Sequence, residues 1–389
     1  MIMKSKKDKE SSDSKGYVFL DTSENEKKKV GYVNGSALSR DYAIRRYIER
    51  QGKFRIVDIS LSKIISSIQI ITKFLTYRNK CILILYPAHY ITMGSYSKIA
   101  RTLSFLCMKT MKYASRNNTF IFDIPDLKHE QAIDIEKHDF DLKYVESRER
   151  QIFSLPAKYV FASEGLMERA IEKYGINPEQ CEVAINGGSL AETVSHEARK
   201  ILDDSDDNSA SETQTIKCVY AGTLTRGRQV QSMIDEVRNC SFIILYLLGT
   251  QGEWIPNYLK TENITNVRFL GSRREDVAAE IVSQCDVGLI PYDDSRLYYN
   301  IAYPTKLSFY ICSGIPYLST PVAEVKKIQD KYGLGFVDKL ENWAKLLCEP
   351  ETQNRIKLMK ETVREQRKEF TWNSILSKVN AYNPNGASF

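Results

Sequence analysis

Short apolar runs alternate with longer amphipathic runs along nearly the whole chain of 389 residues. The strand-length runs lie at 29–34, 54–59, 81–86, 120–124, 159–162 and 182–185, and then at 218–221, 242–248, 267–270, 287–291 and 316–319. Near-continuous apolar strands separated by helices are typical of parallel sheets covered on both faces. We therefore predict an α/β fold with two doubly wound, Rossmann-like domains facing a cleft, and ligands at the carboxyl ends of strands.

Two polar stretches set the expected domain limits. Residues 1–28 are charged and lack an apolar core, so we expect a disordered tail and no secretory signal. Residues 191–215 are acidic, small and polar, and we expect a linker or loop there. The domains then cover 29–190 and 216–350, followed by C-terminal helices over 351–389. No apolar run is long enough to predict a membrane-spanning helix.

The composition argues against several classes of function. None of the eight cysteines forms a CxxC pair, and none of the four histidines has the spacing of a metal motif. We therefore expect no metal, no cofactor and a cytoplasmic protein. The net charge of +6 is mild, so it does not call for nucleic acid.

The segment 97–117 predicts a basic amphipathic helix. It contains five lysines and arginines and no acid, with Ile99, Leu103, Leu106 and Met111 at near-helical spacing. One interpretation is a helix whose apolar side faces the core. The other is a surface that meets anionic lipid or a lipid-linked acceptor, as a peripheral contact with the inner face of the cell membrane.

Three segments of the second half place glycine or a helix start, together with basic residues, directly after a predicted strand. They are 221–228 (AGTLTRGR), 269–274 (FLGSRR) and 304–316 (PTKLSFYICSGIP). In the third, we expect Thr305 to cap a helix that carries Lys306 in its first turn and ends at Gly314. Free N–H groups and the helix dipole suit an anion, and Lys306 adds a full charge. The three segments together predict an anion site at the carboxyl ends of these strands.

These segments carry a resemblance to a known family. The run from Val219 to Pro321 resembles the donor-binding domain of nucleotide-sugar glycosyltransferases with the GT-B fold. FLGSRREDVAAEIVSQCDVGLIPY and PTKLSFYICSGIP resemble one branch in particular, which contains bacterial galactofuranosyltransferase-like enzymes and the glucosyltransferases of serine-rich adhesins. The resemblance extends more loosely to residues 120–127 and 147–171. It also extends to 369–379, which looks like the helix that crosses back onto the first domain.

The resemblance implies roles for particular residues. Lys306 and Arg226 would pair with the donor diphosphate and act in catalysis by neutralising it as it leaves. Ser308 and the helix start would hold phosphate oxygens or ribose, and 271–273 would face the nucleobase. The implied donor-binding set is Gly222, Thr223, Arg226, Gly271, Ser272, Arg273, Thr305, Lys306 and Ser308.

The acceptor side is less constrained by the sequence. Asn34 and Gly35 follow the first predicted strand, where this fold usually has a loop toward the acceptor. Asp123 and His89, each after a strand, are the two candidates for a general base. The stretch from Tyr299 to Gly314 holds no acid, whereas many retaining enzymes of this fold carry a Glu-x7-Glu motif there. The stereochemistry of transfer therefore stays open.

The resemblance implies transfer of a hexose from a UDP-linked or other nucleotide-diphosphate sugar to a glycan, glycolipid or glycoprotein acceptor, in surface polysaccharide or glycoconjugate assembly. The alternative is a non-catalytic subunit of the same fold that stabilises an active transferase. A nucleotide-sugar epimerase is a third hypothesis, and a homo-oligomer is compatible with all three.

Overall fold

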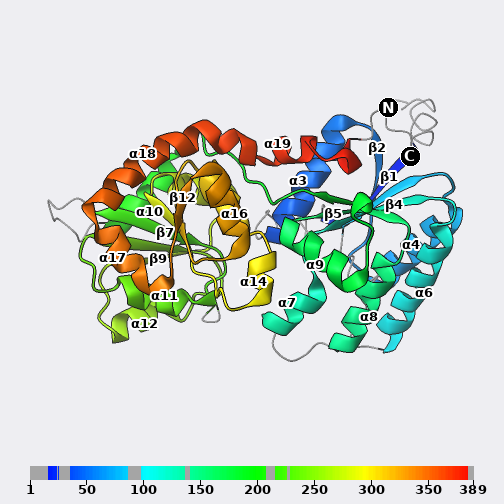
Figure 1. Cartoon of the computed structure of the whole chain (residues 1–389), viewed down its shortest axis with the longest axis horizontal. Helices are drawn as coiled ribbons and strands as arrows, with labels where there is room; N and C mark the ends of the chain where they lie inside the picture. The colour runs from blue at the N-terminus through cyan, green and yellow to red at the C-terminus, as the bar shows by residue number, and fades with distance from the viewer. Residues whose placement is uncertain are drawn as a thin grey trace, which may run out of the picture. The chain divides into compact units, whose positions relative to one another are not determined.

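The computed structural model describes residues 16–23, 25, 36–85, 98–135, 141–206, 215–225 and 228–383. The chain divides into two compact units, which are Met1–Ile185 with Leu376–Phe389 (unit 1) and Asn186–Ile375 (unit 2). Each unit contains a six-stranded parallel sheet with helices packed around it (Figure 1). The predicted α/β fold with two doubly wound domains is confirmed.

Unit 1 is built on a sheet with the strand order β2-β1-β3-β4-β5-β6. Its strands are β1 (Tyr17–Asp21), β2 (Phe54–Asp58), β3 (Cys81–Leu85), β4 (Thr119–Ile124), β5 (Ala157–Phe161) and β6 (Cys181–Val183). Its helices are α3 (Ser36–Gln51), α4 (Lys63–Thr76), α6 (Lys98–Ala114), α7 (Lys128–Asp134), α8 (Leu142–Phe153) and α9 (Glu164–Tyr174). The central strand β3 is buried throughout, as its unbroken apolar sequence predicts, and all of β4 but Thr119 is buried.

The first strand lies inside the stretch that we predicted to be a disordered tail, so that prediction was wrong for residues 17–21. β1 pairs with both β2 and β3, and Val18, Phe19 and Leu20 are buried between helices. Four apolar residues within a charged segment are a weak signal for a strand. The strand forms because it pairs with its two neighbours in the sheet. The strand predicted at 29–34, together with Asn34 and Gly35, lies outside the described residues.

Unit 2 is built on a sheet with the strand order β12-β11-β10-β7-β8-β9. Its strands are β7 (Ile216–Ala221), β8 (Ile243–Leu248), β9 (Val267–Gly271), β10 (Val287–Ile290), β11 (Tyr317–Ser319) and β12 (Gly335–Val337). Its helices are α10 (His196–Asp206), α11 (Val230–Val237), α12 (Ile255–Thr261), α13 (Glu275–Ser283), α14 (Leu297–Ile301), α15 (Thr305–Cys312), α16 (Ala323–Tyr332), α17 (Trp343–Cys348), α18 (Pro350–Gln366) and α19 (Trp372–Ser377), whose last two residues belong to unit 1.

The connections of unit 2 create a switch point in its sheet. From β7 the chain adds β8 and β9 on one side, and it then returns to add β10, β11 and β12 on the other side of β7. In open parallel sheets, ligands bind beside the carboxyl ends of the strands where the order reverses. The carboxyl ends of β7 and β10 are therefore the first place to look for a site.

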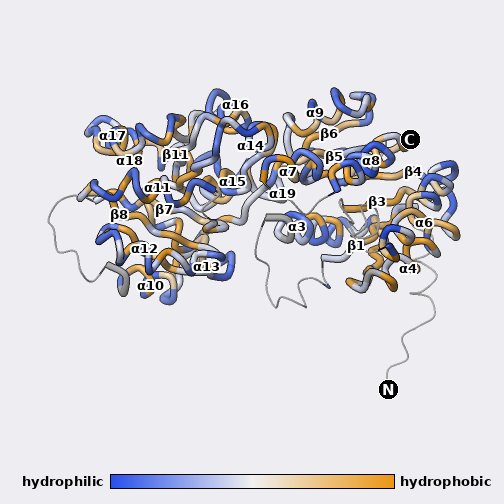
Figure 2. Tube along the Cα trace, turned by 90° about the horizontal axis from the view of Figure 1, so that it is seen from below, coloured by the Kyte–Doolittle hydropathy of each residue, from blue (hydrophilic) through white to orange (hydrophobic). Residues whose placement is uncertain are grey.

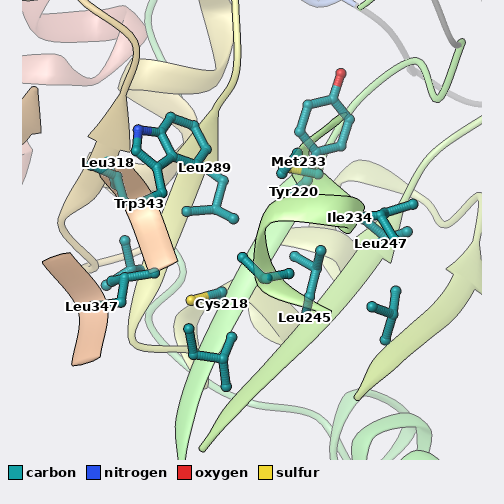
Figure 3. Close-up of a cluster of buried hydrophobic side chains, with 14 of the residues drawn as sticks. Cys218, Tyr220, Met233, Ile234, Leu245, Leu247, Leu289, Leu318, Trp343 and Leu347 are labelled. Atoms are coloured by element: carbon teal, nitrogen blue, oxygen red, sulfur yellow. The ribbon is translucent and has the colours of Figure 1, made fainter. Parts of the chain in front are cut away.

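The core of unit 2 is a cluster of buried aliphatic and aromatic side chains from the sheet, α11 and α17. Figure 3 shows Trp343 and Leu347 beside Leu289 and Leu318. The hydroxyl end of Tyr220, the next-to-last residue of β7, points away from the other side chains. The core thus fixes β7 while the strand end presents a phenol at the switch point.

The predicted domain limits at 190 and 216 need correction. Part of the predicted linker forms α10, which packs on α13, and Ala198 and Leu202 are buried. Ser195 donates its backbone N–H to Glu280 of α13 at 3.0 Å. The acidic residues within 203–206 belong to the end of this helix, and residues 207–214 lie outside the described residues.

The C-terminal helices also divide differently from the prediction. α18 belongs to unit 2, where Ile356 and Val363 are buried and Lys360 pairs with Asp286 at 2.5 Å. Only the segment from Leu376 onward belongs to unit 1. None of the helices that the structure describes is both long and apolar enough to cross a membrane.

Candidate functional site

Helix α15 is anchored at the switch point of unit 2 by Tyr310. The strands β7 and β10 pair at only two positions. Beyond them, the Tyr310 hydroxyl accepts a hydrogen bond from the backbone N–H of Ala221 at 3.0 Å and donates to the Leu289 carbonyl at 3.1 Å. The tyrosine ring lies on Gly288, where a Cβ would approach it to 2.3 Å. This contact holds the helix over the ends of both strands.

Lys306 stands one helical turn before Tyr310, on the same face of α15. The lysine is only 6% exposed. Its Nζ donates to the hydroxyl of Tyr292 at 3.1 Å, and it lies 4.9 Å from the ring centre of Tyr220 and 5.0 Å from that of Tyr292. Tyr292 follows β10 and Tyr220 belongs to β7, so the two phenols hold the amine between the ends of the two strands.

Gly222 makes this position of the lysine possible. A Cβ at Gly222 would lie 2.6 Å from the Cε of Lys306 and 2.8 Å from its Nζ, so any side chain would displace the amine. The φ angle of 149° also favours glycine. The glycine that the sequence singled out after β7 is thus required by the lysine, which comes from 84 residues further along the chain.

Arg228 brings a second cation to the same phenol. It hydrogen-bonds Tyr292, and the groups that shift the pKa values of Lys306 and Arg228 most are tyrosines, with no carboxylate among them. Burial is the largest influence on the pKa of Lys306 and lowers it, but Tyr220 and Tyr292 outweigh burial and raise it. Lys306 therefore stays protonated, and two positive charges meet without an acidic partner in the described part of the chain.

Tyr292 responds to both cations. Burial is again the largest influence and would raise the pKa of the phenol, but Lys306 and Arg228 together lower it below its ordinary value. The ring stacks on Tyr299 with 4.5 Å between ring centres. A phenol that ionises more easily than usual reports a local positive potential, and such a potential attracts an anionic ligand.

Glycines end three neighbouring strands at this edge of the sheet. Gly222, Gly249 and Gly271 follow or end β7, β8 and β9, all with positive φ. The Gly222 N–H donates to the Leu248 carbonyl at 2.8 Å, and the Gly249 N–H donates to the Gly271 carbonyl at 3.0 Å. A Cβ at Gly249 would lie 1.6 Å from the Gly222 oxygen. The strand ends are thus packed backbone against backbone, which permits close approach of a ligand to the main chain.

The remaining predicted donor residues have varied surroundings. The Thr223 carbonyl accepts from the Tyr220 hydroxyl at 2.9 Å. Ser272 is exposed, and the Nη1 of Arg273 donates to the Ser272 carbonyl at 3.2 Å while its buried Nε has no hydrogen-bond partner. Ser272 and Arg273 follow β9, which is two strands away from β7 in the sheet. Arg226 lies outside the described residues, although Thr225 and Arg228 on either side of it are described.

Two expectations about α15 need correction. Pro304, and not Thr305, occupies the capping position, and no side chain caps the first turn. Ser308 is fully buried and its hydroxyl pairs with that of Tyr303 at 2.7 Å. This serine therefore packs the helix against the preceding loop, and it does not face solvent where a phosphate would bind. Thr305 is half-buried at the helix start.

Asp123 does not have the environment of a general base, so that prediction was wrong. It is fully buried at the end of β4, and Arg40 donates to both of its oxygens, at 2.9 and 2.6 Å. The Tyr382 hydroxyl donates to the same carboxylate, and Arg40 also donates to the Ala184 carbonyl at 2.8 Å. The carboxylate is a structural link between β4, α3 and the C-terminal segment. His89, the other candidate, lies outside the described residues.

Sequence reasoning missed several members of the cluster in unit 2. No role was predicted for Tyr220, Tyr292 or Tyr299. In the loop after β7, a role toward the diphosphate was predicted for Arg226 and not for Arg228. The available signal was the density of tyrosine beside Lys306, since 292–310 contains five tyrosines. Asp293, by contrast, is engaged in a turn, where Arg296 pairs with its carboxylate at 3.0 Å and the Ser295 hydroxyl donates to it at 2.6 Å.

Comparison with solved structures identifies the fold. WaaG, a glycosyltransferase involved in lipopolysaccharide biosynthesis, is 13% identical with a TM-score of 0.63, covering 95% of this chain and 100% of that one. HepE from Anabaena in complex with UDP has the same values. Sucrose-phosphate synthase from Thermosynechococcus elongatus is 12% identical with a TM-score of 0.64, covering 95% of this chain and 98% of the enzyme.

These likenesses establish the GT-B fold and no more, because the sequence identities are low. No protein-family model matches the sequence, and no curated protein sequence matches it. The narrower resemblance to the galactofuranosyltransferase and adhesin-glucosyltransferase branch stays a prediction.

Proposed function

We propose that this protein is a glycosyltransferase that transfers a hexose from a nucleotide-diphosphate sugar, with a UDP-hexose as the donor. One observation carries the proposal. Lys306 and Arg228 meet at the switch point of the sheet in unit 2, with tyrosines and glycines around them and no carboxylate partner among the residues that the structure describes. A buried and a half-buried cation thus meet here without a counterion from the described residues, and a diphosphate would supply one.

The same arrangement suits the chemistry of transfer. When the bond between the sugar C1 and the diphosphate oxygen breaks, its electron pair leaves with the nucleoside diphosphate, and negative charge grows on that oxygen. Lys306, Arg228 and the uncapped first turn of α15 place positive charge where it grows. The acceptor hydroxyl supplies the new bond to C1 and loses its proton to a base. No residue is assigned to that base, since Asp123 is engaged with Arg40.

The proposal also covers whether transfer needs a divalent metal ion. We propose that the two cations neutralise the diphosphate without a divalent ion. A chelator should then leave turnover unchanged. Loss of turnover with chelator, restored by added magnesium or manganese, would contradict this part of the proposal.

Two solved complexes of one protein with this fold support UDP as the nucleotide. HepE has been solved with UDP and with UDP-glucose, at TM-scores of 0.63 and 0.61. The acceptor that we propose is a glycan, glycolipid or glycoprotein of surface glycoconjugate assembly. The alternative is a subunit that binds nucleotide without turnover and stabilises an active transferase, and the test below separates the two.

The test is a melting-temperature panel against UDP, GDP, ADP, dTDP and CMP, followed by release of UDP from UDP-hexoses. A nucleotide at 100 times its dissociation constant adds about 2.7 kcal/mol to the free energy of unfolding. We expect stabilisation by UDP that Lys306→Ala removes and Lys331→Ala, at an exposed lysine of α16, retains. UDP binding without slow hydrolysis of any UDP-hexose would favour the non-catalytic subunit. No response to any nucleotide would refute the donor site.

A further inference from the structure

The positive charge of the chain is concentrated in one stretch of unit 1. Residues 59–122 contain nine lysines and arginines and no aspartate or glutamate. The whole chain has 55 basic and 49 acidic residues, so the rest of it carries a net charge of −3 while this stretch carries +9. The stretch contains α4 and α6, which pack side by side (Figure 1). A basic surface on an otherwise slightly acidic protein indicates an anionic partner.

The same two helices carry most of the exposed hydrophobic side chains. Twelve large hydrophobic side chains are exposed among the described residues, and eight of them lie on α4 or α6. They are Ile64, Ile65, Ile68 and Leu75 on α4, and Ile99, Phe105, Leu106 and Tyr113 on α6. Figure 2 shows hydrophobic residues along both helices. Clustered exposure of this kind marks an interaction surface, whereas single exposed residues do not.

The packing of the two helices explains why the large side chains are outside. The buried positions of α6 are Ala100, Ser104, Cys107, Met108, Met111 and Ala114, which are mostly small. On α4, Ser66 and Ser67 are buried, and the Cys107 sulfur lies 4.0 Å from the Ser67 carbonyl. Small residues therefore meet where Cys107 contacts α4, although Ile70 and Phe74 of α4 and Met108 and Met111 of α6 are also buried. Of the stripe predicted to be apolar, Ile99 and Leu106 are exposed, Leu103 is half-buried and Met111 is buried, so only part of this stripe faces the core.

Basic and aromatic side chains alternate with the exposed aliphatic ones. Lys109 lies over the ring of Phe105 at 4.6 Å, and Arg78 and Arg116 lie over Tyr113 at 5.8 and 5.9 Å. Aliphatic chains, tyrosine and long basic side chains on one face are the composition of helices that lie in a membrane interface. There the apolar groups enter the acyl boundary and the cations meet lipid headgroups.

We propose that the exposed face of α4 and α6 docks unit 1 onto an anionic membrane surface. The face combines apolar side chains long enough to enter the bilayer with positive charge, and among the side chains that the structure describes only Arg101 of its basic residues is paired with an acid, Asp141, at 3.1 Å. A second copy of this chain is a poor occupant, because pairing the face with itself would bring together two stretches that each carry a formal charge of +9. The inference stands on unit 1 alone and does not depend on the donor site of unit 2.

The test is sedimentation of the full chain with vesicles of phosphatidylcholine alone, or mixed with phosphatidylglycerol. We expect binding to the mixed vesicles that weakens as salt rises, and little binding to phosphatidylcholine. Lys109→Gln with Lys112→Gln should lower partitioning by about 25-fold, or about fivefold for each lysine. Ile65→Gln with Ile68→Gln should lower it by at least about tenfold.

Matched controls lie in unit 2. Lys331→Gln with Lys345→Gln removes two exposed lysines, and Leu358→Gln removes a leucine that is 67% exposed. Both controls should partition like the wild type. All variants change exposed side chains, and unchanged melting temperatures would show that they fold.

Hydrogen exchange with vesicles locates the contact. Protection should rise over residues 63–76 and 98–114. Equal binding to neutral vesicles, no binding to either kind, or wild-type binding by both face variants would overturn the proposal. A concentration-dependent dimer that Ile65→Gln with Ile68→Gln abolishes would overturn it in favour of a second copy.

Discussion

Replacing Lys306 with methionine separates what this lysine does for ligand binding from what it does for stability. The substitution keeps the length of the side chain and removes the charge. In the unliganded protein the ammonium is nearly buried, beside Arg228 and with no carboxylate partner among the described residues. Tyr220 and Tyr292 raise the pKa of Lys306 through their ionised forms. While the phenols are neutral, a hydrogen bond to Tyr292 and two cation–π contacts of about 0.5–2 kcal/mol each offset only part of the several kcal/mol that burial of an ion costs.

We therefore expect Lys306→Met to leave the free energy of unfolding unchanged or to raise it by up to about 2 kcal/mol. Unit 2 spans 190 residues, from 186 to 375. In a domain of this size, 1 kcal/mol corresponds to about 2–4 °C in melting temperature. If Lys306 can be replaced without lowering the free energy of unfolding, the fold does not need this lysine. That result is expected for a residue whose role is to bind a ligand.

The same substitution should weaken UDP binding. A hydrogen bond from a charged donor contributes about 1.5–3 kcal/mol, so a loss of about 2 kcal/mol raises the dissociation constant about thirtyfold. With UDP at 100 times the wild-type dissociation constant, the stabilisation should fall from about 2.7 to about 0.9 kcal/mol.

Melting curves with and without UDP, together with titration calorimetry, measure both quantities on the same protein. Lys331→Met, at an exposed position of α16, is the control and should change neither. Unchanged UDP affinity in Lys306→Met would refute the assignment of the lysine to the diphosphate. A large drop in the melting temperature of the unliganded variant would refute the reasoning about its burial.

Three other predictions follow from the geometry. Gly222→Ala removes no charge, yet it should weaken UDP binding as Lys306→Met does, because the new Cβ would displace the amine; calorimetry with wild-type affinity would contradict this. Asp123→Ala should destabilise unit 1 by about 3–5 kcal/mol, because it leaves the Arg40 charge buried and unpaired, while UDP binding by unit 2 stays unchanged. Tyr292 has a lowered pKa in the folded state, so its ionisation contributes stability that is fully present above the unfolded pKa and is lost as pH falls through the folded pKa. Tyrosinate absorbance should therefore show a phenol that ionises below its ordinary range. UDP affinity should fall as pH rises through the folded pKa of Tyr292.

The fold was predictable because its signal is local and repeated. Buried parallel strands have continuous apolar sequences, and helices between them have amphipathic ones, so the alternation specifies two doubly wound domains. The exceptions are β1 and the three-residue strand β12, neither of which was predicted. β1 is five residues within a charged segment that pair with β2 and β3, and β12 pairs with β11. The position of Lys306 at the start of a helix was predictable for a similar reason, because its helix and the strand before it can both be recognised locally.

The parts that the sequence could not predict depend on contacts between distant residues. Asp123 looks like any carboxylate near the end of a strand, and its partners Arg40 and Tyr382 lie 83 and 259 residues away. Tyr220 and Tyr292 look like core residues until the sheet order places β7 beside β10. The outward face of α6 was equally hidden, because most of the buried positions of α6 hold small residues and several of its larger ones are exposed.

The measurement that tests the central claim most directly is a crystal structure of the full chain with UDP. The account predicts that the diphosphate lies at the carboxyl ends of β7 and β10, with phosphate oxygens within hydrogen-bond distance of the Lys306 amine and the Arg228 guanidinium. UDP bound elsewhere, or bound with its diphosphate away from both cations, would contradict the account.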